Sequence, residues 1–193
     1  AKMVKQAHSD REMLDLNQEN FVKVRTNTME LTIDRHGGGI IGVQLLKYHK
    51  ELGSDEPVDL LYASDDNNFI AYSGIAGVPG YMGDRSRLFT TEQKEYVVSG
   101  KGQAIELISF GDDDIDIIKR YYIQPEGYLV TMETELKNAS DLVWKGRAFE
   151  EFRSMQLVEN LLKPSDYLPG LVAEEDKSSG MVGMRTYAGA SFA

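Results

Sequence analysis

The chain has 193 residues, which is enough for one domain with a sizeable hydrophobic core. Acidic residues (31) outnumber basic ones (21), and the net charge of -10 disfavours binding to nucleic acid or to an anionic membrane surface. The absence of cysteine excludes disulfides and thiolate metal sites, and no apolar run approaches the roughly 20 residues that span a bilayer.

The first twenty residues are more polar than the rest of the chain. Ser9 and Glu12 fit a capping box for a short helix, but an isolated helix of this length is only marginally stable. We therefore assign residues 1–20 to a polar leader or tether and residues 21–193 to one domain. Because the sequence begins with Ala1 rather than Met, we expect a piece of a longer protein.

Two strand-like segments flank a triple glycine. Apolar residues alternate with polar ones over residues 29–34, and the alternation resumes at residues 41–45. A phosphate-binding loop would lead from Gly37, Gly38 and Gly39 into a helix, with a Lys followed by Ser or Thr. A strand-like segment follows instead, so the glycines predict a turn or bulge with positive φ.

Further strand signals recur along the chain. They cover residues 58–62, 69–74, 96–98 and 103–110, and a hairpin at residues 114–138 that turns at Pro125-Glu126-Gly127. In the hairpin's first strand, one parity is shared by Ile115, Ile117, Tyr121 and Ile123. Strands separated by turns favour an antiparallel β-sandwich.

Three segments do not follow the strand pattern. In residues 148–162 apolar side chains recur every three or four positions, which by pattern alone predicts a helix. Residues 74–87 are rich in glycine, and residues 163–183 contain two prolines and the acidic run at 174–176. We interpret both of these segments as long loops.

No residue pattern specifies a catalytic or metal centre. The aspartates at positions 112, 113, 114 and 116 lack the glycine and distal Glu of a calcium loop, and are interpreted as a solvated hairpin tip. The histidines, His8, His36 and His49, have no partner at zinc-ligand spacing. No nucleophile-elbow motif is present.

Three further side chains have two interpretations each. Glu133 and Glu135 could be paired catalytic carboxylates, but they lie opposite the apolar face of their strand, which favours a solvated surface. Trp144 is the single tryptophan, and could be a ligand platform or a packing residue at a strand entry, the second being favoured. The residues alone thus favour a binding or interaction module over an enzyme.

The stretch VKVRTNTMELTIDRHGGGIIGVQLLKYHKEL resembles the opening of the first periplasmic domain of the bacterial membrane-protein insertase YidC. The family pattern V-x-T, I, G-G and L-x-x-Y-x-x-x-L matches Val24, Thr26, Ile33, Gly37, Gly38, Leu45, Tyr48 and Leu52. DEPVDLL, FIAYSGIAG and the C-terminal MRTYAGASFA resemble later family segments. The resemblance extends over nearly everything after Asn20.

The resemblance implies an all-β, antiparallel β-supersandwich similar to galactose mutarotase. It further implies that the family's domain continues beyond the position matching Ala193, and that residues 148–157 form a strand. It places the domain on the periplasmic side of the Gram-negative inner membrane, with residues 1–20 tethering it to a preceding transmembrane helix. The implied role is non-catalytic: a chaperone-like domain without metal or cofactor, contacting SecF and other Sec components, while nascent membrane proteins meet the membrane part of the insertase.

The mutarotase-like fold also leaves an alternative from another class, a carbohydrate-binding or sugar-acting protein. Such epimerases use a His and a Glu that face a cleft. None of the three histidines lies in the middle of a predicted strand, which counts against this alternative.

The C-terminal segment carries our only candidate site. With period two, one parity contains Met184, Thr186, Ala188, Ala190 and Phe192, and the other contains Arg185 and Tyr187. Arg and Tyr often anchor protein interfaces, so Arg185 and Tyr187 are our candidate partner-binding residues. In the related family this segment is similar to the start of the SecF-contacting region, and a strand at an open sheet edge can also accept a partner strand.

Overall fold

The computed structural model describes residues 18–64, 67–77, 84–111, 114–156, 174–176, 181–183 and 191–192. After a 3₁₀ turn at Gln18–Asn20, the first strands are β1 (Phe21–Arg25), β2 (Met29–Asp34), β3 (Ile40–His49), β4 (Pro57–Ala63), β5 (Asn67–Gly77) and β6 (Glu95–Val97). The later strands are β7 (Gln103–Ser109), β8 (Ile115–Ile123), β9 (Val130–Asn138), β10 (Gly146–Gln156), β11 (Glu174–Asp176), β12 (Met181–Gly183) and β13 (Ser191–Phe192). This described part contains no α-helix, and the predicted capping box at Ser9 and Glu12 lies outside it.

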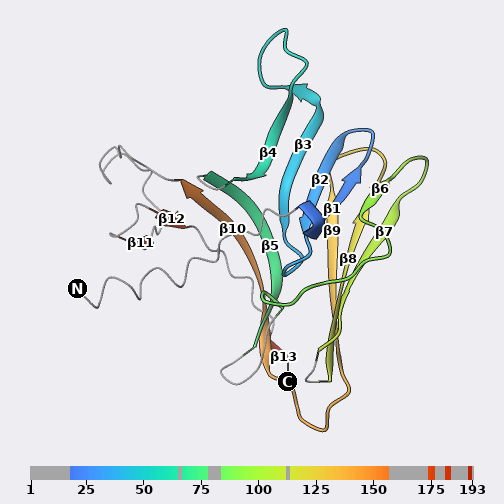
Figure 1. The fold of residues 1–193 in the computed structure, drawn as a ribbon, viewed down its shortest axis with the longest axis vertical. Helices are drawn as coiled ribbons and strands as arrows, with labels where there is room; N and C mark the ends of the chain where they lie inside the picture. Colours follow the sequence, from blue (N-terminus) through green and yellow to red (C-terminus); the bar gives the residue numbers. More distant parts are fainter. Residues whose placement is uncertain are drawn as a thin grey trace.

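The strands form two main sheets that face each other (Figure 1). The large sheet has the order β13-β10-β5-β4-β3-β2-β1-β6, and the small sheet has the order β7-β8-β9. A separate pair, β11 and β12, completes the described strands. Every pairing is antiparallel except that of β1 with β6. The predicted antiparallel β-sandwich is therefore confirmed, with one parallel pairing that the alternation of apolar residues could not predict.

The core lies between the small sheet and the β1–β3 half of the large sheet. Period-two alternation along β8 buries Ile115, Ile117, Tyr121 and Ile123, the four residues whose shared parity predicted a common face. They pack with buried side chains of β1, β2, β6 and β7, which include Val22, Val24, Leu31, Ile33, Tyr96, Ile105 and Leu107. Burial of these side chains at both sheets is the main force that holds the sandwich together.

The triple glycine forms the turn between β2 and β3, as predicted. Gly37 and Gly38 have φ of +74° and +71°, a left-handed conformation that costs about 1–2 kcal/mol for a residue with a side chain. The ladder between the two strands is irregular at Thr32 and Ile33, immediately before the turn. No helix follows the glycines, so the turn lacks the frame of a phosphate-binding loop.

The helical prediction for residues 148–162 is wrong over 148–156. This part belongs to β10, which pairs with β5 along its whole length, from Gly146 opposite Gly77 to Gln156 opposite Asn67. Phe149 and Phe152 stack on Tyr72 and Phe69 respectively, on opposite faces of the sheet. Tertiary pairing therefore overrides the local pattern, and the strand implied by the family resemblance is confirmed up to Gln156.

The two predicted loops need correction as well. Strand β5 continues to Gly77, because residues 74–77 pair with the start of β10. The acidic run Glu174–Asp176 forms β11 and pairs with β12, although its composition is atypical of a strand. The rest of the segment at residues 163–183 lies outside the described residues.

Candidate functional site

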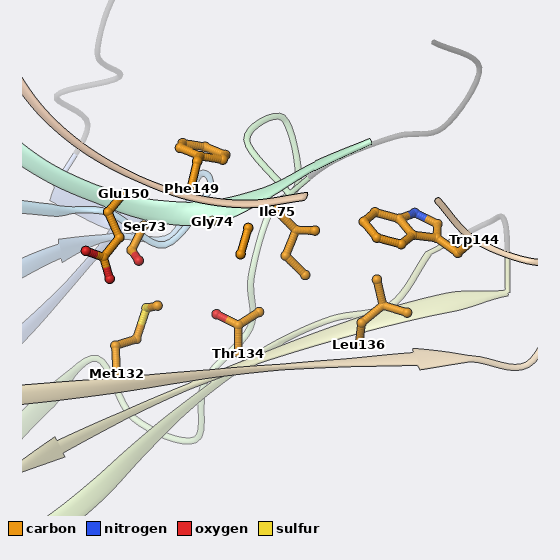
Figure 2. Close-up of a pocket in the computed structure, with 10 residues that line it drawn as sticks. Ser73, Gly74, Ile75, Met132, Thr134, Leu136, Trp144, Phe149 and Glu150 are labelled. Atoms are coloured by element: carbon orange, nitrogen blue, oxygen red, sulfur yellow. The ribbon is translucent and has the colours of Figure 1, made fainter. Parts of the chain in front are cut away.

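A cavity of about 450 Å³ lies between the two sheets, next to β9, the edge strand of the small sheet (Figure 2). Its upper wall comes from β5 and β10, and its lower wall comes from β9. The lining residues are Ser73, Gly74, Ile75, Met132, Thr134, Leu136, Trp144, Ala148, Phe149 and Glu150. A volume of this size falls within the range of small-molecule and side-chain binding pockets, about 300–1,000 Å³.

The walls are mainly apolar because the alternation of β9 brings Met132, Thr134 and Leu136 to one face. Met132 and Leu136 are only partly buried, in contrast to the fully buried side chains of β8. Trp144 precedes β10 and closes one end of the cavity with its indole ring (Figure 2). The ring also packs on Gly146, where a Cβ atom would lie 1.9 Å from it. The favoured interpretation of Trp144 as a packing residue at a strand entry therefore holds, and the ring lines the cavity as well.

Four of the lining side chains carry polar groups: Ser73, Thr134, Trp144 and Glu150. Glu150 is exposed and lies next to Ser73, its partner in the ladder between β5 and β10, at the end of the cavity away from Trp144 (Figure 2). The Thr134 hydroxyl and the Trp144 indole nitrogen are buried, and neither has a hydrogen-bond partner among the described residues. An unpaired buried polar group is destabilising, so a ligand that bonds to either one gains free energy.

Beside the cavity lies a buried ion pair that the sequence analysis missed. The Lys119 ammonium on β8 lies 2.8 Å from the Asp84 carboxylate, and both side chains have no exposed surface. The ammonium also donates to the backbone oxygens of Gly37 and Ser73, and the Tyr121 hydroxyl donates to that of Gly38. Lys119 thus connects the small sheet with the glycine turn and with a backbone group of the cavity wall.

Burial shifts the pKa values of Lys119 and Tyr121, the two side chains that donate to the glycine turn. Desolvation lowers the pKa of Lys119, and the neighbouring Asp84 carboxylate opposes part of that effect. Burial, with a smaller contribution from Asp84, raises the pKa of the Tyr121 hydroxyl, so that it remains a neutral hydrogen-bond donor. Because Lys119 is inaccessible to solvent, its amine cannot reach a substrate and acts within the fold.

The residues that follow Asp84 make further contacts with strands around the buried ion pair. Arg85 lies 3.4 Å from Glu151 on β10 and over the ring of Tyr72, while Arg87 donates to the Ile115 backbone oxygen at 2.6 Å. Gly74 leaves room for the Asp84 carboxylate, whose oxygen would lie 2.5 Å from a Cβ at that position. Gly74, the first glycine of this segment, therefore permits close packing around a charged group.

The sequence itself contains a signal that Lys119 is buried. It shares the inward parity of Ile115, Ile117, Tyr121 and Ile123, and a lysine at a core position of a strand demands a buried partner. No comparable signal marks Asp84, which lies in a polar segment far away in the sequence. Only the tertiary fold brings the two charges together.

The remaining candidates behave as surface groups. On the outer face of the small sheet, Arg120 lies 3.4 Å from Glu133 and 2.7 Å from Glu135, consistent with the predicted solvated face. Asp114 is exposed just before β8, while residues 112–113 lie outside the described part. No three His, Asp or Glu side chains in the described ranges gather closely enough to hold a metal ion.

Neither of the two histidines in the described ranges lines the cavity. His36 pairs with Leu88 in a bridge beside the glycine turn, and His49 is the exposed last residue of β3. His8 lies outside the described residues, as do the candidate partner-binding residues Arg185 and Tyr187. Within the described ranges Glu150 is the one ionisable side chain that lines the cavity.

Two facing sheets, a buried ion pair and a lateral apolar cavity define an all-β sandwich domain. Residues 21–190 match the family model described as YidC periplasmic domain. The chain therefore belongs to the YidC periplasmic domain family. No helix in the described ranges has the length and apolar character needed to cross a membrane.

Similar proteins carry one recurring name, "Membrane protein insertase YidC". The protein from Marinobacter nauticus is 30% identical over 145 residues, which are 72% of this chain and 25% of that protein. The protein from Saccharophagus degradans is 25% identical over 177 residues, which are 90% of this chain and 28% of that protein. The chain thus spans about a quarter of the length of the curated relatives it matches.

Proposed function

We propose that this chain is a non-catalytic periplasmic domain of an inner-membrane protein insertase, and that it contributes contacts with the Sec machinery while membrane proteins are inserted. The match of residues 21–190 to the periplasmic-domain family carries this proposal. Insertion of nascent membrane proteins would be performed by other parts of a longer protein, because the relatives named insertase are about four times the matched length. Residues 1–20 would tether the domain to the membrane.

The chemistry of the cavity supports a non-catalytic role. General acid–base catalysis usually needs two groups with matched roles within reach of one substrate. Among the described residues the cavity offers the single carboxylate of Glu150, while the amine of Lys119 is sealed in the fold. A cavity of this composition is better suited to holding a segment than to transforming it.

Arg185 and Tyr187 are our proposed contacts with SecF. Supporting this, strand β13, a few residues further along the chain, pairs with the start of β10, where Ser191 lies opposite Arg147, and β13 forms one edge of the large sheet among the described strands. An edge position leaves side chains and backbone groups available to a partner. Arg and Tyr supply the planar hydrogen bonding and rigid area typical of binding hot spots.

The proposal is tested in full-length protein, in detergent, by measuring affinity for SecF. Arg185→Glu with Tyr187→Ala should weaken binding by about tenfold or more, the scale of a hot-spot loss, with an unchanged melting temperature. The matched control is Arg25→Glu with Tyr48→Ala, two exposed residues of the same types elsewhere on the domain. Unaltered affinity, or an equal loss in the control, would contradict the proposal.

A further inference from the structure

The connection between β5 and β6 contains a strap, residues 84–90, that crosses one end of the sandwich from the large sheet to the small sheet (Figure 1). At its start, the Asp84 amide donates to the backbone oxygen of Ile75 in β5 at 3.0 Å. At its end, Thr90 exchanges backbone hydrogen bonds of 2.7 and 2.8 Å with Ile108 of β7. The strap therefore joins both sheets without being a strand of either one.

The middle of the strap packs on the glycine turn between β2 and β3. The Gly37 amide donates to the Arg87 backbone oxygen at 2.8 Å, and the Phe89 amide donates to the Arg35 backbone oxygen at the same distance. The Phe89 ring has no exposed surface and belongs to the hydrophobic core. The strap thus closes this end of the core with an aromatic side chain.

One side chain of the small sheet reaches all of these parts. The Lys119 ammonium on β8 lies 2.8 Å from the Asp84 carboxylate of the strap, and it donates to the backbone oxygens of Gly37 and Ser73. These three acceptors match the three N–H groups of an ammonium. The nitrogen also lies 5.4 Å from the centre of the Phe89 ring. Lys119 therefore connects the strap, the glycine turn and β5 to β8.

The strap can leave its place without breaking the pairing of any strand in the described sheets. Its contacts are single hydrogen bonds, isolated bridges, one buried ring and the ion pair, whereas β7 pairs with β8 along its whole length. Segments held in this way open at a lower free-energy cost than paired strands. Without the Lys119 charge, the buried Asp84 carboxylate would have no counter-ion and would regain hydration only when the strap opens.

We propose that the strap has two states, closed and open, and that the Lys119–Asp84 ion pair is the latch that keeps it closed. When the latch is broken, residues 84–90 and the glycine turn open together while the strands remain paired. Opening exposes the Phe89 ring, so this end of the domain gains an apolar surface that the closed state hides. The latch is internal to the described part of the chain and does not depend on a contact with SecF.

Hydrogen–deuterium exchange of the full-length protein in detergent, followed by mass spectrometry, measures the opening of each segment. In Lys119→Met, exchange over residues 35–39 and 84–90 should accelerate about tenfold more than exchange in the paired strands β7 and β8. Lys119→Met with Asp84→Asn should show a smaller selective acceleration, because no unpaired carboxylate drives the opening. This double variant buries no isolated charge, so it carries the test if the single variant does not fold.

The matched control is Ile123→Ala, which truncates a fully buried side chain at the end of β8 away from the strap's hydrogen bond to Ile115. It lowers stability without touching the latch, so it should accelerate the strap and the paired strands by the same factor. An equal acceleration in the Lys119 variants, or no acceleration of the strap in either of them, would overturn the proposal.

A disulfide gives an independent test, because the 193 residues contain no cysteine. His36 and Leu88 lie opposite each other in an isolated bridge between the strap and the glycine turn, with hydrogen bonds on both sides but none between them. Cα atoms of such a pair lie about 4.5 Å apart, which a disulfide can span. In Lys119→Met, His36→Cys with Leu88→Cys should abolish the selective acceleration when oxidised and restore it when reduced. Selective acceleration that persists in the oxidised form would also overturn the proposal.

Discussion

The two halves of this sandwich show the same alternation of apolar residues, but their inward-facing side chains differ in how deeply they are buried. Where β7 and β8 face β1 and β2, side chains such as Leu107 and Ile117 are fully buried. Where β9 faces β5 and β10, Met132 and Leu136 remain partly exposed around a cavity. Alternation of apolar residues is present in both halves, so alternation alone does not determine the depth of burial. Leu107 on β7 is fully buried and Leu136 on β9 is only partly buried, although both strands are edges of the small sheet in the described part.

The buried Lys119–Asp84 pair lies where the two halves meet, and breaking it should have the largest effect. Lys119→Met leaves the Asp84 carboxylate buried without its partner, which typically costs about 3–5 kcal/mol of unfolding free energy. Guanidinium denaturation followed by tryptophan fluorescence measures this loss. The double variant Lys119→Met with Asp84→Asn removes both charges and should recover part of the stability. Equal stability of the single and double variants would show that the carboxylate tolerates isolation.

Two leucine truncations compare the halves directly. Leu107→Ala in the filled half should lower the unfolding free energy by about 3 kcal/mol, because it removes fully buried methyl groups and leaves a void. Leu136→Ala beside the cavity should cost only about 1 kcal/mol, since its side chain is already partly exposed to solvent. Urea denaturation of both variants gives the difference. Equal costs would mean that the open half is packed as tightly as the filled half.

The smallest expected difference between two paired variants concerns the glycine turn. Gly38→Ala and Gly53→Ala both place alanine at positive φ, but a Cβ at Gly38 would lie 2.9 Å from Lys119 Cδ, whereas Gly53 has open space. We expect about 1 kcal/mol for Gly53→Ala, from the backbone alone, and about 2 kcal/mol for Gly38→Ala. Thermal melts of the two variants isolate the contact with Lys119. Equal melting temperatures would show that the Lys119 stem shifts without cost.

Sequence reasoning succeeded where a local pattern determines the outcome. The alternation in β8 and the turn at Gly37 and Gly38 follow from side-chain period and backbone sterics, which are properties of a few neighbouring residues. It failed at residues 148–156, where the pairing of β10 with β5 overrides an apolar spacing typical of a helix. Local patterns carry no information on which distant strand will supply that pairing.

The candidate site shows the same limit more strongly. Trp144 could be identified as a packing residue, but its place in a cavity depends on β5, β9 and β10 meeting at one point. Lys119 had a detectable parity signal, while Asp84 and Glu150 became meaningful only through their positions in space. Arg185 and Tyr187 remain predictions that rest on sequence and family resemblance.

The bonds to the glycine turn also impose an order on folding. Lys119 donates to a backbone oxygen 82 residues earlier in the chain, and Tyr121 donates to one 83 residues earlier. When the chain emerges N-terminus first, β2 and β3 can pair at once, but the carbonyls of their turn gain these partners only after β8 has appeared. Contacts of such long sequence separation slow folding. The hairpin of β2 and β3 therefore lacks these two hydrogen bonds until the residues that follow it, as far as β8, have been synthesised.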